Sequence, residues 1–135
     1  MTTPNPQLPT SNKLPTAKSQ PKGKPFDIRE RTLQFALRII TLTSQLPESV
    51  EGRLVRQQLA SAGTSVGANV EEADGAVSKA DKRRALVIAR KETRETRYWL
   101  QIVDRTWPGK LDVKPEVAEA TEILYILSSI ITKLE

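Results

Sequence analysis

The residue types that carry most enzyme chemistry are missing from this chain. Its 135 residues include no His and no Cys. Histidine is the commonest general base and a frequent metal ligand, and cysteine supplies thiolate nucleophiles and zinc ligands. Ser, Thr and Lys are present, but no acid–base pair beside them is evident that would activate a nucleophile. The composition therefore predicts a protein that is not an enzyme and that holds no metal and no cofactor.

One pair of glutamates gives a pattern that resembles a metal site. Glu92 falls within the apolar arc of a predicted helix, and Glu95 borders that arc. Di-metal bundles combine such glutamates with Glu-x-x-His motifs, which this chain cannot supply because it has no His. We therefore expect Glu92 to be paired with other side chains and to have a structural role. The candidate partners are Arg53, Arg56 and Asn69.

Cations recur along one side of the same predicted helix. At about 100° per residue, seven of them share one sector of the helix surface. Regular cations on one face suit the phosphate backbone of a nucleic acid, because each neutralised phosphate releases counterions. The alternative is a solvent-exposed face whose charge is balanced by acids of other helices. The chain has few aromatic residues, so the sequence gives little support for stacking on bases. The candidate nucleic-acid-binding residues are Arg83, Arg84, Arg90, Lys91, Arg94, Arg97 and Arg105.

The excess positive charge is concentrated at the N-terminus. The formal net charge is +5, and residues 1–25 hold four lysines and no acid. The other 110 residues hold 17 cations and 16 anions, so the body of the protein is nearly neutral. Residues 1–25 also hold six of the nine prolines and are predicted to be disordered, because they cannot bury enough apolar surface. Such a tail is either a simple appendage or an electrostatic arm for nucleic acid.

No part of the sequence predicts export or membrane insertion. Residues 1–25 lack the apolar run of a signal peptide, and no apolar stretch is long enough to span a bilayer. The absence of Cys fits a reducing compartment. We therefore expect a cytoplasmic protein.

Residues 26–135 form the predicted folded domain and carry four helical patterns and no strand pattern. Asp27 followed by Glu30 has the arrangement of a capping box, so the first helix is predicted from Asp27 to Leu46. The other helices are predicted from about Glu48 to Gly75, from Ser78 to Thr106 and from Pro115 to the C-terminus. Short connections make an all-α, antiparallel up-down four-helix bundle the simplest fold.

Small residues fill the middle of the second predicted helix, between 60 and 68. Gly63 and Gly67 lie in this stretch, and a glycine costs about 1 kcal/mol relative to alanine in a helix interior. Either the helix breaks here or the small residues let another helix approach closely. We favour close packing.

The first and last predicted helices have wider apolar arcs than a single contact surface needs. In the first helix, Leu33, Leu37 and Ile40 form a row beside a second row, and Arg31 and Arg38 fall on the opposite polar face. Surplus apolar surface in a small domain indicates self-association, although a well-buried core is the alternative. The second row is Phe35, Ile39, Leu42 and Leu46.

Four segments of this sequence resemble a known bacterial family of four-helix bundles. The segments are ERTLQFALRI at 30–39, LPESVEGR at 46–53, GTSVGAN at 63–69 and ARKETRETRYWL at 89–100. The family was first noted as proteins encoded in intervening sequences of 23S ribosomal RNA. The resemblance covers about residues 26–134, and GTSVGAN is its most specific part.

The resemblance implies an assembly and a partner. It implies a homopentameric barrel of four-helix bundles with a central pore, in which the second helix stays helical through Gly63 and Gly67. The family includes the accessory variability determinant of diversity-generating retroelements, which binds nucleic acid and partners a reverse transcriptase. It therefore implies nucleic-acid binding, with RNA favoured, by the basic stretch of the third helix; a protein-interaction scaffold without nucleic-acid contact is the alternative. The matching positions are Arg83, Arg84, Arg90, Lys91, Arg94 and Arg97.

Overall fold

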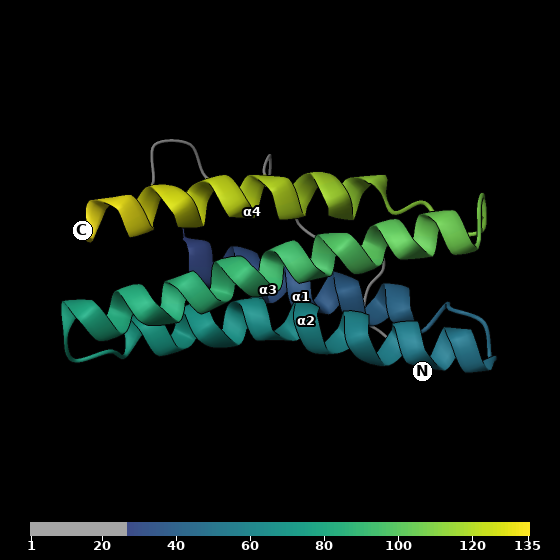
Figure 1. The fold of residues 1–135 in the computed structure, drawn as a ribbon, viewed down its shortest axis with the longest axis horizontal. Helices are drawn as coiled ribbons and strands as arrows, with labels where there is room; N and C mark the ends of the chain where they lie inside the picture. The colour runs from purple at the N-terminus through teal and green to yellow at the C-terminus, as the bar shows by residue number, and fades with distance from the viewer. Residues whose placement is uncertain (1–26) are drawn as a thin grey trace.

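The computed structural model describes residues 27–135 as four α-helices, with no strand in this range (Figure 1). The predicted tail, residues 1–25, lies outside the described residues. The helices are α1 (Ile28–Thr43), α2 (Val50–Asp74), α3 (Lys79–Thr106) and α4 (Lys114–Lys133). The all-α prediction is therefore confirmed. Within this range, no helix combines the length and the apolar character needed to cross a lipid bilayer.

The helices begin where local capping chemistry predicts. The Asp27 carboxylate accepts hydrogen bonds from the backbone N–H groups of Arg29 and Glu30. Ser49 and Ser78 cap α2 and α3 in the same way, and a proline occupies the first turn of α4. These side chains satisfy backbone donors that have no partner within the first turn of a helix.

The first helix ends at Thr43, three residues before the predicted end at Leu46. The Arg56 guanidinium, from α2, donates hydrogen bonds to the backbone carbonyls of Thr43 and Leu46 at 3.2 and 2.9 Å. An external donor thus satisfies carbonyl groups that are left without a helical partner, and the chain can turn early. The prediction that Arg56 pairs with Glu92 is wrong, because Arg56 serves this turn instead.

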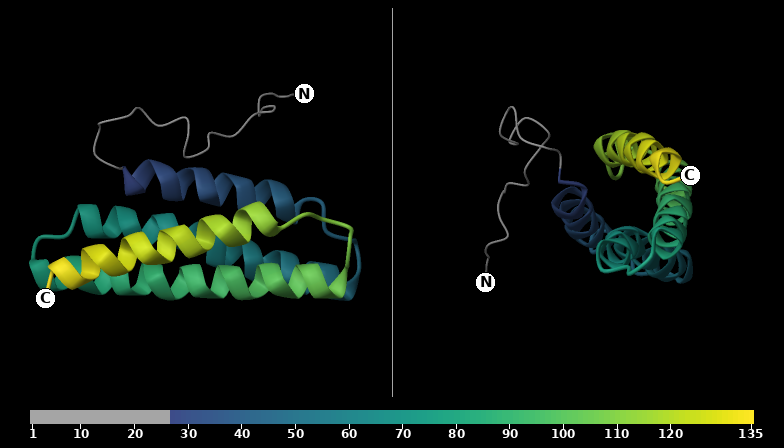
Figure 2. Two further views of the ribbon diagram at one scale, coloured as in Figure 1. Left: turned by 90° about the horizontal axis from the view of Figure 1, so that it is seen from above. Right: turned by 90° about the vertical axis from the view of Figure 1, so that its left-hand side faces the viewer.

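The four helices follow one another around a common core (Figure 2). Each helix packs extensively on the next one in the chain, whereas α1 and α4 have the least extensive contact. Consecutive helices run in opposite directions, as short connections require, so the predicted antiparallel bundle is confirmed. Large side chains from all four helices fill the core: Phe35, Ile39, Leu59, Leu100, Ile123 and Leu127 are fully buried.

The glycines of α2 allow α1 to approach closely. The helix continues unbroken through Gly63 and Gly67, which confirms close packing over a helix break. A Cβ atom at Gly63 would lie 2.7 Å from Cγ2 of Ile39, and one at Gly67 would lie 3.4 Å from the backbone of Thr32. The first distance is too short for any side chain, so a glycine is required at position 63 for α1 to pack as it does.

One of the two predicted apolar rows of α1 is not buried in the bundle. Leu33, Leu37 and Ile40, which we call the α1 apolar row, are 51%, 44% and 48% exposed. Val50 and Leu54, in the first two turns of α2, are also exposed. Because α1 contacts only α2 and α4, it buries the neighbouring row that includes Phe35 and leaves the first row in solvent.

Candidate nucleic-acid interface on α3

The structure divides the seven predicted cations of α3 into two groups. Arg83, Arg90 and Arg97 lie at intervals of seven residues and are partly buried toward α4. Their guanidinium groups donate to Glu135 at 2.7 Å, to Ser128 at 3.2 Å and to Thr121 at 3.1 Å. Their partners, Thr121 and Ser128 of α4 and Glu135 just beyond its C-terminal end, are also seven residues apart. We call these three contacts the α3–α4 ladder, which fixes the alignment of two antiparallel helices.

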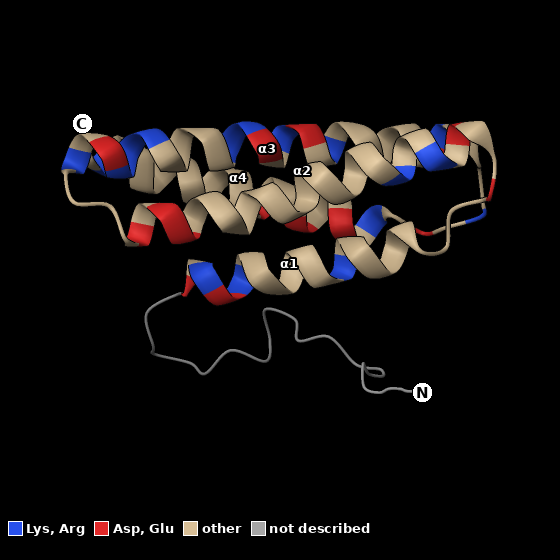
Figure 3. Cartoon of the chain, turned by 90° about the horizontal axis from the view of Figure 1, so that it is seen from below, with Lys and Arg blue, Asp and Glu red and all other residues tan. Residues whose placement is uncertain are grey.

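The other four cations face solvent. Arg84, Lys91, Arg94 and Arg105, which we call the solvent cation row, are all exposed. None of the ion pairs within residues 27–135 involves any of them. Their first and last members are separated by about 32 Å along the helix axis at 1.5 Å per residue. Figure 3 shows Lys and Arg recurring along α3, whereas the middle of α2 carries no charge.

The two groups differ in what their charge can do. An exposed cation without an ion-pair partner can neutralise a phosphate and release a counterion. A ladder arginine is already engaged by α4, so a phosphate would have to compete with its intramolecular contact. The sequence pattern could not separate these groups, because Arg83 and Arg84 are neighbours and only the packing decides which of them meets α4.

Glu92 is not paired with Arg53 or Arg56, and that prediction is wrong. No ion pair between residues 27 and 135 involves Glu92, which is half-buried on α3. Burial, and to a smaller extent the nearby Glu95, raise the pKa of the Glu92 carboxyl above its ordinary value. The Asn69 side chain donates to the backbone carbonyl of Ser65, one turn earlier in α2. In the described range, no cluster of acidic side chains could hold a metal ion.

Two arginines predicted on the outer polar face of α1 instead contact α4. Arg31 forms a bidentate pair with Glu119 and lies 3.7 Å from Glu122, and Arg38 lies 3.5 Å from Glu116. We call these contacts the ionic seam. The Arg31, Arg38, Glu116 and Glu119 side chains are only 11–16% exposed. The hydrogen bond to Glu119 raises the pKa of Arg31, and burial raises the pKa of Glu116 although Arg38 opposes it.

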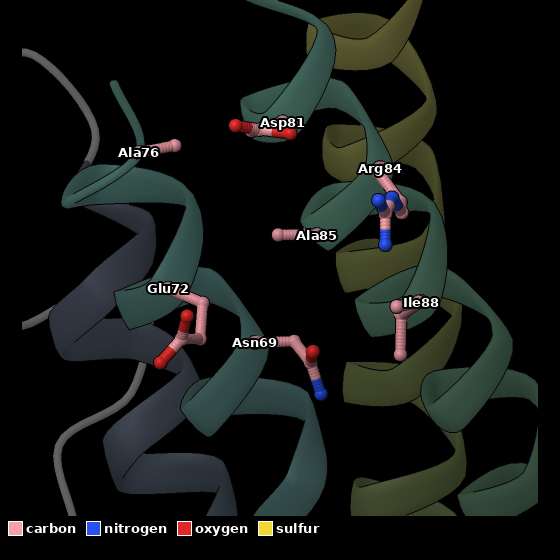
Figure 4. A pocket seen from close by; sticks show the side chains of 7 residues that line it. All are labelled: Asn69, Glu72, Ala76, Asp81, Arg84, Ala85 and Ile88. Atoms are coloured by element: carbon pink, nitrogen blue, oxygen red, sulfur yellow. The ribbon is translucent and has the colours of Figure 1, made fainter. Parts of the chain in front are cut away.

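A cavity of about 290 Å³ lies beside the N-terminal end of the solvent cation row, between α2 and α3 (Figure 4). Asn69 and Ala85 extend into the space between the helices, and Arg84 belongs both to the cavity wall and to the row. Two carboxylates on its lining give the cavity a mixed charge, which disfavours a phosphate at its centre. The lining residues are Asn69, Glu72, Ala76, Asp81, Arg84, Ala85 and Ile88.

Comparison with known proteins decides the family. Residues 24–129 match the family model described as 23S rRNA-intervening sequence protein. The chain belongs to this family. The match includes all of α1, α2 and α3 and most of α4, so the family resemblance of the sequence is confirmed.

A solved structure of the same kind supports the fold of this intervening-sequence family member. It is a protein of unknown function from the S23 ribosomal protein family of Bacteroides thetaiotaomicron, with 36% sequence identity and a TM-score of 0.71. The similarity covers 78% of this chain and 98% of the other. No curated protein matches the chain. Neither the family description nor the solved structure assigns an activity or a ligand.

Proposed function

We propose that this protein is a non-catalytic, oligomeric accessory protein that binds nucleic acid, with RNA favoured, through α3. The solvent cation row is the observation that carries the proposal. Its four cations are exposed, and no ion pair within residues 27–135 involves them, so their charge is available to phosphates. Several phosphates along a backbone can be neutralised by cations distributed over about 32 Å of helix.

The ladder arginines have a different role in this proposal. Arg83, Arg90 and Arg97 add to the positive field of α3 but hold α4 in place. Their replacement would disturb the bundle as well as the charge. Binding experiments therefore need variants of the solvent cation row alone.

The proposed assembly uses the α1 apolar row. Arg31 and Arg38 lie on the flank of α1 that contacts α4, whereas Leu33 and Ile40 are exposed to solvent on a helix that also packs on α2. The neighbouring part of α2, residues 57–70, carries no charge. An exposed apolar row beside an uncharged helix suits a second copy of this chain. Repeated around an axis, such a contact closes a ring, and the family resemblance suggests a pentamer.

The proposed protein partner is a reverse transcriptase. The proposal rests on the family resemblance, which includes the accessory determinant of diversity-generating retroelements. It places the protein in the cytoplasm, beside the template RNA.

The test compares two triple variants of equal charge. Arg84→Ala, Lys91→Ala and Arg94→Ala together remove three solvent cations, and Arg53→Ala, Lys110→Ala and Lys133→Ala remove three exposed cations elsewhere. Binding of a labelled RNA is measured by fluorescence anisotropy at several salt concentrations. We expect only the first variant to lose affinity strongly, with the slope of log K against log salt reduced by about two. Equal losses in both variants would show that binding follows net charge and not the row.

The N-terminal tail requires a separate control. Residues 1–25 carry four lysines and no acid, and could bind RNA without help from α3. A chain that lacks residues 1–25 should keep the difference between the two triple variants. If all affinity disappears with the tail, the proposed role of α3 is refuted.

A protein-interaction scaffold is the second candidate function. The near-neutral body, with 17 cations and 16 anions in residues 26–135, favours it together with the exposed α1 apolar row. A scaffold predicts no RNA binding at low salt by the purified protein, and stable co-purification with a reverse transcriptase through a surface that includes Leu37.

A further inference from the structure

An aromatic side chain stands in the middle of the solvent cation row. Tyr98 is 56% exposed. Arg84, Lys91, Tyr98 and Arg105 follow one another at intervals of seven residues, so they share one face of α3. Arg94 lies one turn before Tyr98 on the neighbouring line of the same face. On this face cations therefore lie seven residues before and seven residues after the ring, and one turn away the ring has one cation, Arg94, and one exposed acid, Glu95.

The structure also restrains this ring. The rings of Tyr98 and Trp99 are 5.3 Å apart and nearly perpendicular, with an angle of 79° between their planes. Trp99 is half-buried and packs on the hydrophobic core. An edge-to-face contact of this kind stabilises an aromatic pair and limits the motion of the exposed member. Tyr98 thus presents an ordered aromatic surface to solvent at low entropic cost.

A second exposed tyrosine shows that exposure alone does not create this arrangement. Tyr125 on α4 is 69% exposed. The side chains one turn away from it are Thr121, Glu122, Ser128 and Ser129, and none is a cation. Tyr98 differs from Tyr125 because it has a cation, Arg94, one turn away and shares its helix face with cations that no ion pair within residues 27–135 involves.

We infer that Tyr98 is a stacking platform for an unpaired base, and that the ligand of α3 is single-stranded or looped RNA, not duplex. This inference rests on the proposed function. Base stacking on an aromatic side chain, combined with a cationic track for the backbone, is the chemistry of single-strand binding. In a duplex the bases are stacked on each other, so the ring could contact only backbone and groove atoms. For base stacking, the position of Tyr98 among the cations matters more than the small number of aromatic residues in the chain.

The experiment uses the full chain and two labelled RNAs of equal length, a single strand without secondary structure and a blunt duplex. Tyr98→Ala should weaken binding of the single strand roughly ten-fold and leave duplex binding unchanged. Tyr98→Phe keeps the stacking surface and should bind the single strand like the wild type. Tyr125→Ala, the matched control, should change neither affinity. The salt slope should be the same in all three variants, because none of them removes a phosphate contact.

Several outcomes would overturn the inference, and they differ from those that overturn the proposed function. Equal loss of single-strand and duplex binding in Tyr98→Ala, or no loss of either, would show that Tyr98 does not stack on a base. Loss of binding in Tyr98→Phe would indicate a hydroxyl contact. A change of assembly mass in Tyr98→Ala would place the ring between copies of the chain. If the wild type binds neither RNA at low salt, the proposed function fails first.

Discussion

At single positions, one or two neighbouring groups determine which side chain the fold tolerates. Gly63 has no room for a Cβ atom because the buried Ile39 side chain occupies that space. Glu92 belongs to no ion pair within residues 27–135, and burial makes its charged form unfavourable. These two positions lead to predictions with opposite signs: an added atom should destabilise the protein at position 63, and a removed charge should not at position 92.

The two glycines in the middle of α2, Gly63 and Gly67, should respond differently to alanine. Gly63→Ala gains about 1 kcal/mol of helix propensity, but overpacking against Ile39 typically costs about 1–3 kcal/mol. We therefore expect net destabilisation, because the new Cβ would lie 2.7 Å from Cγ2 of Ile39. Gly67→Ala, with its nearest atom at 3.4 Å, should be neutral or stabilising by up to about 1 kcal/mol. The urea midpoints of the two variants measure both effects, provided that the dependence of unfolding free energy on urea is unchanged. Equal midpoints would contradict the close contact between Gly63 and Ile39.

Glu92→Gln should not weaken the fold at pH 7. A carboxyl whose folded-state pKa is raised favours folding in its protonated form, and this contribution is lost as the pH rises through the folded-state pKa. Glutamine resembles the protonated form, so the variant should equal or exceed the wild type at pH 7 by less than about 1 kcal/mol. The difference in unfolding free energy between Glu92→Gln and the wild type should shrink as the pH falls below the unfolded-state pKa of the carboxyl. Urea titrations at pH 7 and pH 4 measure it, and a large loss at pH 7 would indicate a charge partner for Glu92.

At the scale of helices, α1 is held by two unlike contacts. It packs on α2 through the close approach at Gly63 and Gly67, and it reaches α4 through the ionic seam. Since α1 and α4 have the least extensive contact in the bundle, the seam accounts for much of their attachment. Removing one partner of a partly buried pair costs more than removing one partner of an exposed pair, because water screens the remaining charge less. After loss of Glu119, Arg31 would keep the weaker contact with Glu122 at 3.7 Å.

Glu119→Ala should therefore be much more damaging than removal of an exposed acid. Glu119 pairs with Arg31 at side-chain exposures of 16% and 11%, whereas Asp74 pairs with Arg29 at 56% and 48%. We expect Glu119→Ala to cost about 2–3 kcal/mol and Asp74→Ala less than about 1 kcal/mol. Chemical denaturation compares the two variants. Similar small losses would mean that solvent screens the seam as fully as it screens an exposed pair.

The helices were largely predictable, because their ends depend on local chemistry. Asp27, Ser78 and Pro115 mark helix starts through caps and a fixed backbone angle, which neighbouring residues alone determine. The contacts that each side of a helix makes with other helices could not be predicted. Arg31 could face solvent or α4 with the same periodicity, and acids at Glu116, Glu119 and Glu122 became a signal only once α4 was known to lie beside α1.

The sequence predicted which cations lie on α3, but it did not predict which of them face solvent and which contact α4. All seven cations lie on α3 as expected, yet the structure assigns three to the ladder and four to solvent. The sequence also contained Tyr98 at the seven-residue spacing of Arg84 and Lys91. That spacing was a usable signal, but its meaning depended on knowing which line of α3 faces away from α4.

At the scale of the molecule, two surfaces of different character lie on different helices. The solvent cation row belongs to α3, and the α1 apolar row belongs to α1, which packs on α2. Such separation would let copies of the chain associate through α1 and α2 while each α3 stays available to RNA. An assembly would then place several cation rows on one particle and raise its avidity for a long RNA.

Leu37→Glu should reduce the proposed assembly to smaller species. A charge in the middle of the α1 apolar row would be buried without a partner between two copies, and this cost opposes association. Val77→Glu is the control, because Val77 is fully exposed in the α2–α3 connection and away from the row. Sedimentation velocity measures both masses. An unchanged mass for Leu37→Glu, or an equal fall for Val77→Glu, would exclude the row as the interface.

The α3–α4 ladder also has a consequence for the order of folding. Its three contacts join residues 24, 38 and 52 positions apart in the chain. The entropy lost on closing a loop increases with its length, so the Arg97–Thr121 contact is the cheapest to form from the unfolded chain. Once it has formed, each further contact closes only a short additional segment. The hairpin of α3 and α4 should therefore close progressively from its connecting loop toward Arg83, and the end near Glu135 should open first when the bundle frays.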